Sequence, residues 1–325
     1  MRILALVLSL LIALSSPVFA TCAGADLRAQ LAPDVLDRIE ARAARIPYAE
    51  GNLWRAQKGA AVIHILGTVH LGDRRITPSI ERLRPLVEGA ELVLLEITQA
   101  EQIRMQNDPG LILMPGSRTL PSMMSDEAWD EIAEALKDRG FPPIMAARMK
   151  PFFLSGILSI PPCAMTGLHS NEGVDATIES MALAKGIPSR SLESLDEVIQ
   201  IIDAFPMDLQ IAMLSGSLPR PDLPDDMLET LIAAYLREMV ADGWLVMREL
   251  GKDAAFGGKP EFAAIMDEID TRLLVERNRL WIPRLLAAAG PKPIFAAVGA
   301  AHLSGDQGVL NLLAQEGYTL TRLPF

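Results

Sequence analysis

A motif made of an apolar run, a glycine, two further residues and a histidine occurs twice in this chain, and it constrains the fold more than any other feature. In the first copy an apolar run breaks at Gly67 and is followed by His70; in the second, near the C-terminus, it breaks at Gly299 and is followed by His302. Glycine tolerates the backbone angles and the close contacts of a sharp strand exit. The two histidines are therefore expected just beyond the ends of two buried strands.

Strand-like and helix-like segments alternate along the chain, which predicts an α/β fold. A turn at Lys58-Gly59 joins the first two apolar segments into a hairpin. We expect a mostly parallel central sheet with this N-terminal hairpin, crossover helices and a large helical insertion, all in one domain over residues 21–325. Helical insertions are expected at about 100–185 and 205–290. The expected strands are residues 51–57, 61–66, 91–96, 187–192, 294–299 and 318–323.

Several helix starts carry recognisable capping residues. Thr77 precedes a proline, Asp175 precedes a helix-like run, and Ser194 and Ser304 each stand three residues before a Glu or Gln. These are the signals of N-caps and capping boxes. Residues 262–288 have the apolar spacing of one long amphipathic helix.

Two glutamates also follow predicted strands, Glu96 and Glu193. In parallel sheets functional groups collect at the carboxyl ends of the strands, so both are expected near His70 and His302. Two imidazoles and one or two carboxylates can form a site for Zn²⁺, Mn²⁺ or another first-row ion. Such an ion would acidify a bound water, and a spare carboxylate would act as base. The competing interpretation of Glu193 is a neighbour of the Ser194 helix cap.

Other polar residues have two interpretations each. Asp73 either orients the imidazole of the preceding histidine or is a turn residue after Gly72. Arg277 either binds a negatively charged substrate group or lies on the solvated face of its helix. His64 lies within a strand and is expected to be structural, while His169 lies in a loop.

Composition and the N-terminus restrict location and partners. The chain has 30 Lys+Arg and 41 Asp+Glu, a net charge of −11, which argues against nucleic acid as a partner. Residues 1–20 have the charge, apolar run and small residues of a signal peptide, so we expect a periplasmic or secreted protein without a stable membrane span. Cys22 and Cys163 are then either one disulfide or two unrelated thiols.

Six short segments together carry a resemblance to a known family. They are LGTVHLGD (66–73), VLLE (93–96), GVD (173–175), LES (192–194), ERN (276–278) and VGAAHL (298–303). In order and spacing the sequence resembles the TraB/GumN family, bacterial relatives of the TIKI proteases. The wider superfamily includes erythromycin esterases and the haem-binding ChaN proteins.

The resemblance implies a metal-dependent hydrolase that acts on a peptide, or on another small-molecule substrate. It places the metal, Mn²⁺ or Co²⁺, between His70, His302 and Glu96; the ligand types also admit Zn²⁺. We expect Glu193 to be the fourth ligand or the base, and Arg277 to stabilise substrate charge. Two alternatives stay open: a metal-independent esterase-type hydrolase that uses the same His and Glu residues, and a haem- or ligand-binding protein of the ChaN type.

Overall fold

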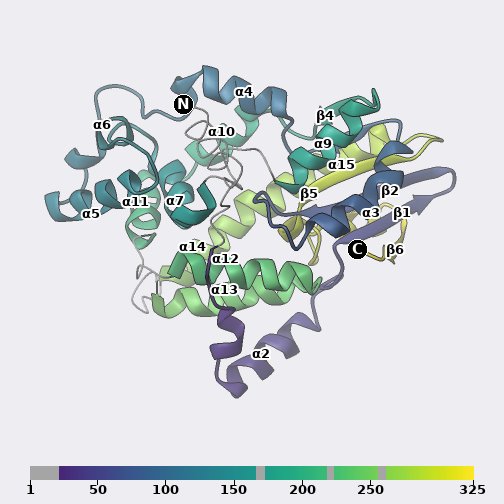
Figure 1. Cartoon of the computed structure of the whole chain (residues 1–325), viewed down its shortest axis with the longest axis horizontal. Helices are drawn as coiled ribbons and strands as arrows, with labels where there is room; N and C mark the ends of the chain where they lie inside the picture. The colour runs from purple at the N-terminus through teal and green to yellow at the C-terminus, as the bar shows by residue number, and fades with distance from the viewer. Residues whose placement is uncertain (1–21, 166–172, 218–222, 255–260) are drawn as a thin grey trace, which may run out of the picture.

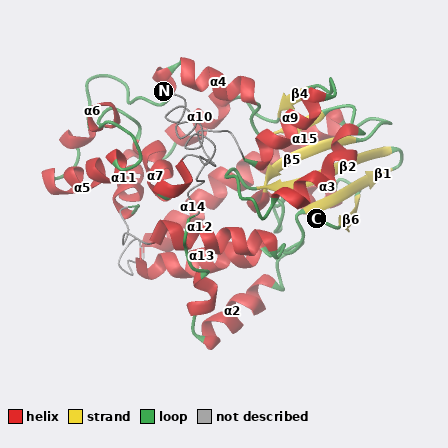
Figure 2. Cartoon of the chain, in the orientation of Figure 1, coloured by secondary structure: helices red, strands yellow, loops and turns green. Residues whose placement is uncertain are grey.

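The fold is built on a six-stranded sheet with strand order β4-β3-β5-β2-β1-β6, which lies toward one side of the molecule (Figures 1 and 2). The computed structural model describes residues 22–165, 173–217, 223–254 and 261–325. Strands β4, β3, β5 and β2 run parallel, and β1 and β6 add an antiparallel edge. The mostly parallel α/β fold expected from the sequence is thus confirmed. The strands are β1 Leu53–Lys58, β2 Ala61–Thr68, β3 Val93–Leu95, β4 Ser189–Ser191, β5 Ile294–Gly299 and β6 Thr319–Leu323.

The described part of the chain contains twenty helical segments, which pack on this sheet or on one another. The longer ones are α2 Pro33–Ala43, α3 Thr77–Glu88, α4 Gln99–Asn107, α5 Asp126–Lys137, α6 Pro143–Ala146, α7 Pro151–Ser159, α9 Val174–Ala184, α10 Leu195–Asp203, α11 Met207–Gly216, α12 Leu223–Leu236, α13 Val240–Ala254, α14 Glu261–Asp270, α15 Arg277–Ala288 and α16 Val309–Gln315. Short 3₁₀ segments are η1 Leu27–Gln30, η2 Pro109–Leu111, η3 Leu120–Ser122, η4 Pro162–Ala164 and η6 Ala300–His302, and η5 Thr271–Glu276 is a π-helix.

The parallel strands are paired in a register that aligns their carboxyl ends. Ala297 of β5 pairs with Leu66 of β2 on one side and with Leu95 of β3 on the other. Leu95 in turn pairs with Ser191 of β4. Because these four residues form one row across the sheet, the chain leaves all four strands at the same edge.

Two apolar cores cover the two faces of the sheet, because successive strand residues point to opposite faces. Phe295 and Ala297 of β5 pack with helices α3, α9 and α12, whereas Ala296 and Val298 pack with α15 and α16. All four side chains are essentially inaccessible to solvent. Burial on both faces explains the apolar runs of the central strands β2, β3 and β5.

Some of the helices that connect the strands pack with one another in a core apart from the sheet. Between β3 and β4, helices α5 and α7 share a third core with α11, from the next connection, around Ile132, Leu154 and Leu214. Figure 1 shows these helices on the side of the molecule away from the strands. Helix α13 packs against α2. A smaller fourth core forms there, in which Ile39 of α2 lies with Leu245 and Val246 of α13.

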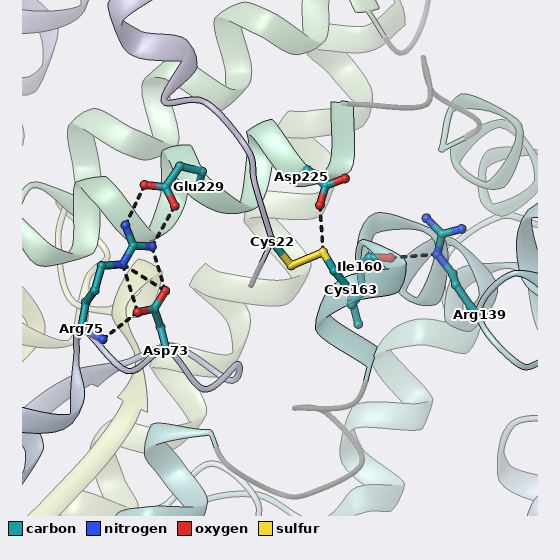
Figure 3. Close-up of a disulfide and its surroundings, with 8 residues drawn as sticks. All are labelled: Cys22, Asp73, Arg75, Arg139, Ile160, Cys163, Asp225 and Glu229. Carbon is teal, nitrogen blue, oxygen red and sulfur yellow. Dashed lines mark hydrogen bonds and ion pairs between the residues drawn. A yellow bond between two sulfur atoms is a disulfide. The ribbon is translucent and has the colours of Figure 1, made fainter. Parts of the chain in front are cut away.

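A disulfide joins Cys22 to Cys163, across 141 positions of sequence, with a Cα–Cα distance of 5.5 Å (Figure 3). The residues after Cys22 run along α12, where Ala25 N–H donates to Asp226 at 2.7 Å and Leu27 N–H donates to Thr230 Oγ1 at 2.8 Å. The disulfide therefore ties the N-terminal segment to η4, and the two hydrogen bonds tie it to α12.

Three expected helix starts differ from the observed ones. Ser194 caps α10 with both bonds of the capping box, as expected, but Thr77 is the first residue of α3 and Ile76 is its N-cap. Gly173 rather than Asp175 is the N-cap of α9. The expected capping box at Ser304 is wrong: Gly305 has a left-handed φ of +98°, which interrupts a helix there, and α16 starts only after Gly308.

The long helix predicted over residues 262–288 is present as a continuous helical path, but its middle turn is π-helical. Residues Thr271–Glu276 adopt this wider form between α14 and α15. Within the described part of the chain no single helix has both the length and the apolar character to cross a membrane; one pair, α10 and α11, bent by 94°, meets these criteria only when taken together.

Replacing Gly67 by alanine is expected to destabilise the fold. A Cβ at this position would lie 2.7 Å from Leu303 Cδ1 and 3.0 Å from the backbone Cα of Ala300, so β2 and η6 would have to separate. We expect Gly67→Ala to lower the free energy of unfolding by about 1–3 kcal/mol, measured by urea denaturation. Gly156→Ala is the control, because its Cβ would meet no atom within 4 Å in α7, and it should be neutral or stabilising by up to about 1 kcal/mol. Equal stability of both variants would contradict the prediction.

Candidate functional site

Four polar residues leave the parallel strands at the common edge. Glu96 directly follows β3, His70 and Glu193 follow β2 and β4 after one intervening residue, and His302 lies in η6 immediately after β5. A fifth residue, Arg277, reaches the same place from the first position of α15. The structure divides these five into a buried cluster and one exposed histidine.

The buried cluster contains His302, whose orientation is set by Asn278. The Asn278 Nδ2 group donates to the carbonyl of Gln307 at 2.8 Å and to that of His302 at 3.3 Å. Its Oδ1 atom therefore faces His302 Nδ1, at 2.7 Å. Because this oxygen can only accept, Nδ1 carries the proton and Nε2 of His302 carries the lone pair.

The lone pair of His302 Nε2 points toward two other residues of the cluster. Arg277 Nη1 donates to it at 3.3 Å, and Glu96 Oε1 lies 3.6 Å away. The ring is 4% exposed and lies against the indole of Trp281, with 4.4 Å between ring centroids. Burial lowers the pKa of His302 to about 3, so the imidazole is neutral at physiological pH.

Glu96 is an ionised carboxylate held by two donors. Its Oε1 accepts the backbone N–H of Gly299 at 2.5 Å, and its Oε2 accepts Arg277 Nη2 at 2.7 Å. Burial raises the pKa of Glu96, but the electrostatic effect of the nearby His302, the charges of Arg277 and His70 and the hydrogen bond from the Gly299 amide outweigh it and bring the pKa to about 2, where His302 itself becomes protonated. The carboxylate is thus a fixed negative charge beneath the edge of the sheet.

Arg277 occupies the centre of the buried cluster and uses all five of its N–H groups. Nε donates to the two oxygens of Glu193 at 2.9 and 3.1 Å, and Nη2 donates to Glu193 as well as to Glu96. Nη1 donates to His302 and, at 3.1 Å, to the carbonyl of Leu273 one turn earlier. Glu193 is 2% exposed, and this burial raises its pKa despite the ion pair with Arg277. An anionic substrate group would have to displace one of these acceptors to bind the guanidinium.

His70 forms the exposed part of the site and is paired with Asp175. Its Nδ1 lies 2.8 Å from Asp175 Oδ2, and the other Asp175 oxygen accepts the hydroxyl of Thr68 at 2.6 Å. The His70 side chain is 64% exposed. The charge of Asp175 raises the pKa of His70 to about 9, against a smaller opposite effect of burial. At neutral pH this imidazole is therefore protonated, unlike that of His302.

Asp73, which the sequence suggested as the partner of the first histidine, lies elsewhere. It accepts from Arg75 at 2.7 Å, and Arg75 also donates to Glu229 of α12 at 2.8 Å (Figure 3). These ion pairs hold the loop after His70 against α12. The partner of His70 comes from α9 instead, because Gly173 lets that helix start pack on the His70 backbone: a Cβ there would lie 2.4 Å from the His70 carbonyl oxygen.

Gly299 is the point at which the two parts of the site meet. A Cβ on this residue would lie 3.1 Å from Glu96 Oε1, 3.5 Å from His302 Cδ2 and 3.6 Å from His70 Nε2. The three side chains thus surround one bare stretch of backbone at the end of β5. Gly299 therefore leaves room for the three site side chains beside the backbone, whereas Gly67 allows β2 to pack closely on Ala300 and Leu303.

A metal ion shared by His70, Glu96 and His302 requires their ligand atoms to lie close to one another. Among the described residues, the set of three ligand atoms within 4.8 Å of one another is Cys22, Cys163 and Asp225; His70, Glu96 and His302 do not form such a set. Both sulfurs of the first set belong to the disulfide and are not thiolates. Between Glu96, Glu193 and His302 stands the guanidinium of Arg277. In this arrangement the residues do not fit a shared metal ion.

Sequence reasoning missed the roles of two residues of the site. The sequence singles out Asn278 only as the neighbour of Arg277, and it predicts Asp175 to be a helix cap. These two residues instead orient the two histidines. Their places in the ERN and GVD segments were the only signals. His64 lies in β2 opposite Arg55, away from the strand end, and His169 lies outside the described residues.

The two histidines are expected to titrate far apart. Nuclear magnetic resonance of the imidazole ¹⁵N nuclei should show His70 protonated up to about pH 9 and His302 neutral down to about pH 3. Because the native pKa of His70 lies above the value of about 6.5 for a free imidazole, the stabilisation from its ion pair is complete below pH 6.5 and is lost as the pH rises through about 9.

Asp175→Asn removes the charge that raises this pKa, so the His70 pKa should fall toward about 6.5, while His302 stays neutral in both proteins. A wild-type His70 that titrates near 6.5 would contradict the assignment.

Comparison with known proteins places most of the chain in one family. The model of the TraB/PrgY/gumN family matches residues 52–322, which include every site residue named above. Two proteins with the printed name "Uncharacterized protein YbaP", from Escherichia coli strain K12 and from Shigella flexneri, are each 21% identical to this chain over 250 residues. The match covers 77% of this chain and 87% of each relative. The chain therefore belongs to the TraB/PrgY/gumN family.

Proposed function

We propose that this protein is a hydrolase in which His70 takes the proton from an attacking water molecule. The observation that carries this proposal is the state of His70: its Nδ1 is held by Asp175, its ring is largely exposed, and no described residue hydrogen-bonds to its Nε2. A histidine oriented through one nitrogen and open at the other is the arrangement of a general base. The carboxylate of Asp175 stabilises the imidazolium that forms when the proton arrives.

The buried cluster provides the fixed charges around this reaction. Glu96 lies beside the same backbone atoms as His70 Nε2 and adds a second negative charge that favours the imidazolium. His302 and Glu193 hold Arg277 in place. Both residues are buried, so a substrate could reach them only after a rearrangement. The resemblance to TIKI proteases makes a peptide bond the first bond to test, and carboxylic esters the second.

Of the two hydrolytic mechanisms expected from the sequence, the geometry supports the metal-independent one. A divalent ion between His70, His302 and Glu96 requires these ligand atoms to approach one another, and the guanidinium of Arg277 contacts two of the three residues instead. The haem-binding alternative needs a free imidazole nitrogen. Both nitrogens of His302 are hydrogen-bonded, which leaves His70 for that role.

Export to the periplasm or the medium is part of the same proposal. The Cys22–Cys163 disulfide supports it, because such bonds persist in oxidising compartments. Mass spectrometry of the protein from a cell fractionation should give a mature chain that begins at Thr21. A full-length chain in the cytoplasmic fraction would overturn this part of the proposal.

Activity is expected to depend on His70 and not on added metal. With quenched fluorescent peptides and ester substrates, kcat/KM of the wild type should be unchanged by a chelator and should rise with pH through about 9, as His70 loses its proton. His70→Ala should lower kcat/KM by about 10²–10⁴-fold. His64→Ala, on the same strand but away from the edge, is the matched control and should keep wild-type activity.

Asp175→Asn should shift the rise in kcat/KM to lower pH and reduce its plateau, since the imidazolium loses its stabilising charge. Loss of wild-type activity in the chelator, restored by Mn²⁺, Co²⁺ or Zn²⁺, would reject the metal-independent mechanism and favour the metal-dependent one.

A further inference from the structure

Three side chains of the kinds that bind metal ions converge on the guanidinium of Arg277. Glu96 and Glu193 accept its hydrogen bonds, and His302 presents to it the nitrogen that carries the lone pair. Glu96 Oε1 and His302 Nε2 are already 3.6 Å apart, a separation that two ligands of one ion can have at bond lengths of about 2.0–2.2 Å. All three residues are less than 10% exposed.

We propose that Arg277 is the resident cation of this site: its guanidinium stands where a divalent ion would be bound by Glu96, Glu193 and His302, and it keeps such ions out. The cation on which the site depends is thus part of the chain. The proposal rests on the site of the proposed hydrolase, but it concerns which cation fills that site.

The charges explain why a cation is needed there. Two buried carboxylates repel each other and lose their hydration, so both remain ionised only beside a positive group. A guanidinium satisfies this need well, because its planar array of five donors reaches several oxygens at once. With Arg277 in place, a divalent ion would meet a like charge in a buried setting and would lack open ligand positions.

The position of the guanidinium is also set by its own helix. Arg277 Nη1 donates to the Leu273 carbonyl one turn earlier, and the guanidinium carbon lies 4.8 Å from the centre of the Trp281 ring one turn later. The turn that ends immediately before Arg277 is the π-helix Thr271–Glu276. Such turns are rare and are frequently found at functional sites. The Arg277 side chain is 13% exposed, so packing as well as ion pairing holds the guanidinium in place.

The test counts metal ions bound by the tag-free mature protein, with Zn²⁺ or Mn²⁺ alone as probe. After exposure to excess ion and gel filtration, the wild type should retain less than about 0.1 ion per chain, whereas Arg277→Met should retain about one, as expected for a site with three protein ligands. The ion should also raise the thermal midpoint of Arg277→Met but not that of the wild type. Adding Glu193→Gln to Arg277→Met should abolish this binding.

Arg279→Met is the matched control, because Arg279 lies two residues further on the same helix, is exposed and donates to Gln307; it should behave as the wild type. If Arg277→Met does not fold, the wild-type measurement decides. About one tightly bound ion per wild-type chain, lost in His302→Ala, would overturn the proposal. So would a folded Arg277→Met protein that binds no ion. Since neither readout measures turnover, a wrong choice of hydrolytic substrate cannot imitate either result.

Discussion

The parallel pairing of β2, β5, β3 and β4 is the constraint on which the rest of the structure depends. Its register puts Leu66, Ala297, Leu95 and Ser191 in one row, so that each strand delivers its next polar residue to the same edge. A shift of one residue in any strand would move its apolar side chains to the opposite face. The two separate cores on the faces of the sheet therefore fix the register of the strands, and with it the position of the site residues.

Burial then divides the polar edge into two parts with opposite behaviour. His302 loses its proton because it is buried, and His70 keeps its proton because the charge of Asp175 is close. Two histidines from one repeated sequence motif thus differ in pKa by several units. The difference arises from their partners, an amide in one case and a carboxylate in the other, and both partners come from helices distant in sequence.

Much of the fold followed from local pattern. Apolar runs marked the central strands β2, β3 and β5, a Lys-Gly turn marked the hairpin, and Ser194 with Glu197 marked a helix start that the structure reproduces. Two of the misplaced starts, those expected at Asp175 and Ser304, lie where tertiary contacts use the residue or the neighbouring backbone differently. Asp175 binds His70, and Gly305 takes a left-handed conformation beside Pro47.

The sequence by itself determined the order of strands and helices and which residues stand at the strand ends, because apolar periodicity and glycine position are local properties. It also placed Arg277 and Asn278 next to each other on one helix. Only the tertiary structure decided that Arg277 turns inward between two glutamates, that Asn278 orients His302, and that Asp175 rather than Asp73 pairs with His70. Those contacts span between 24 and 181 positions of sequence, and charge pairing over such separations depends on packing that no local pattern encodes.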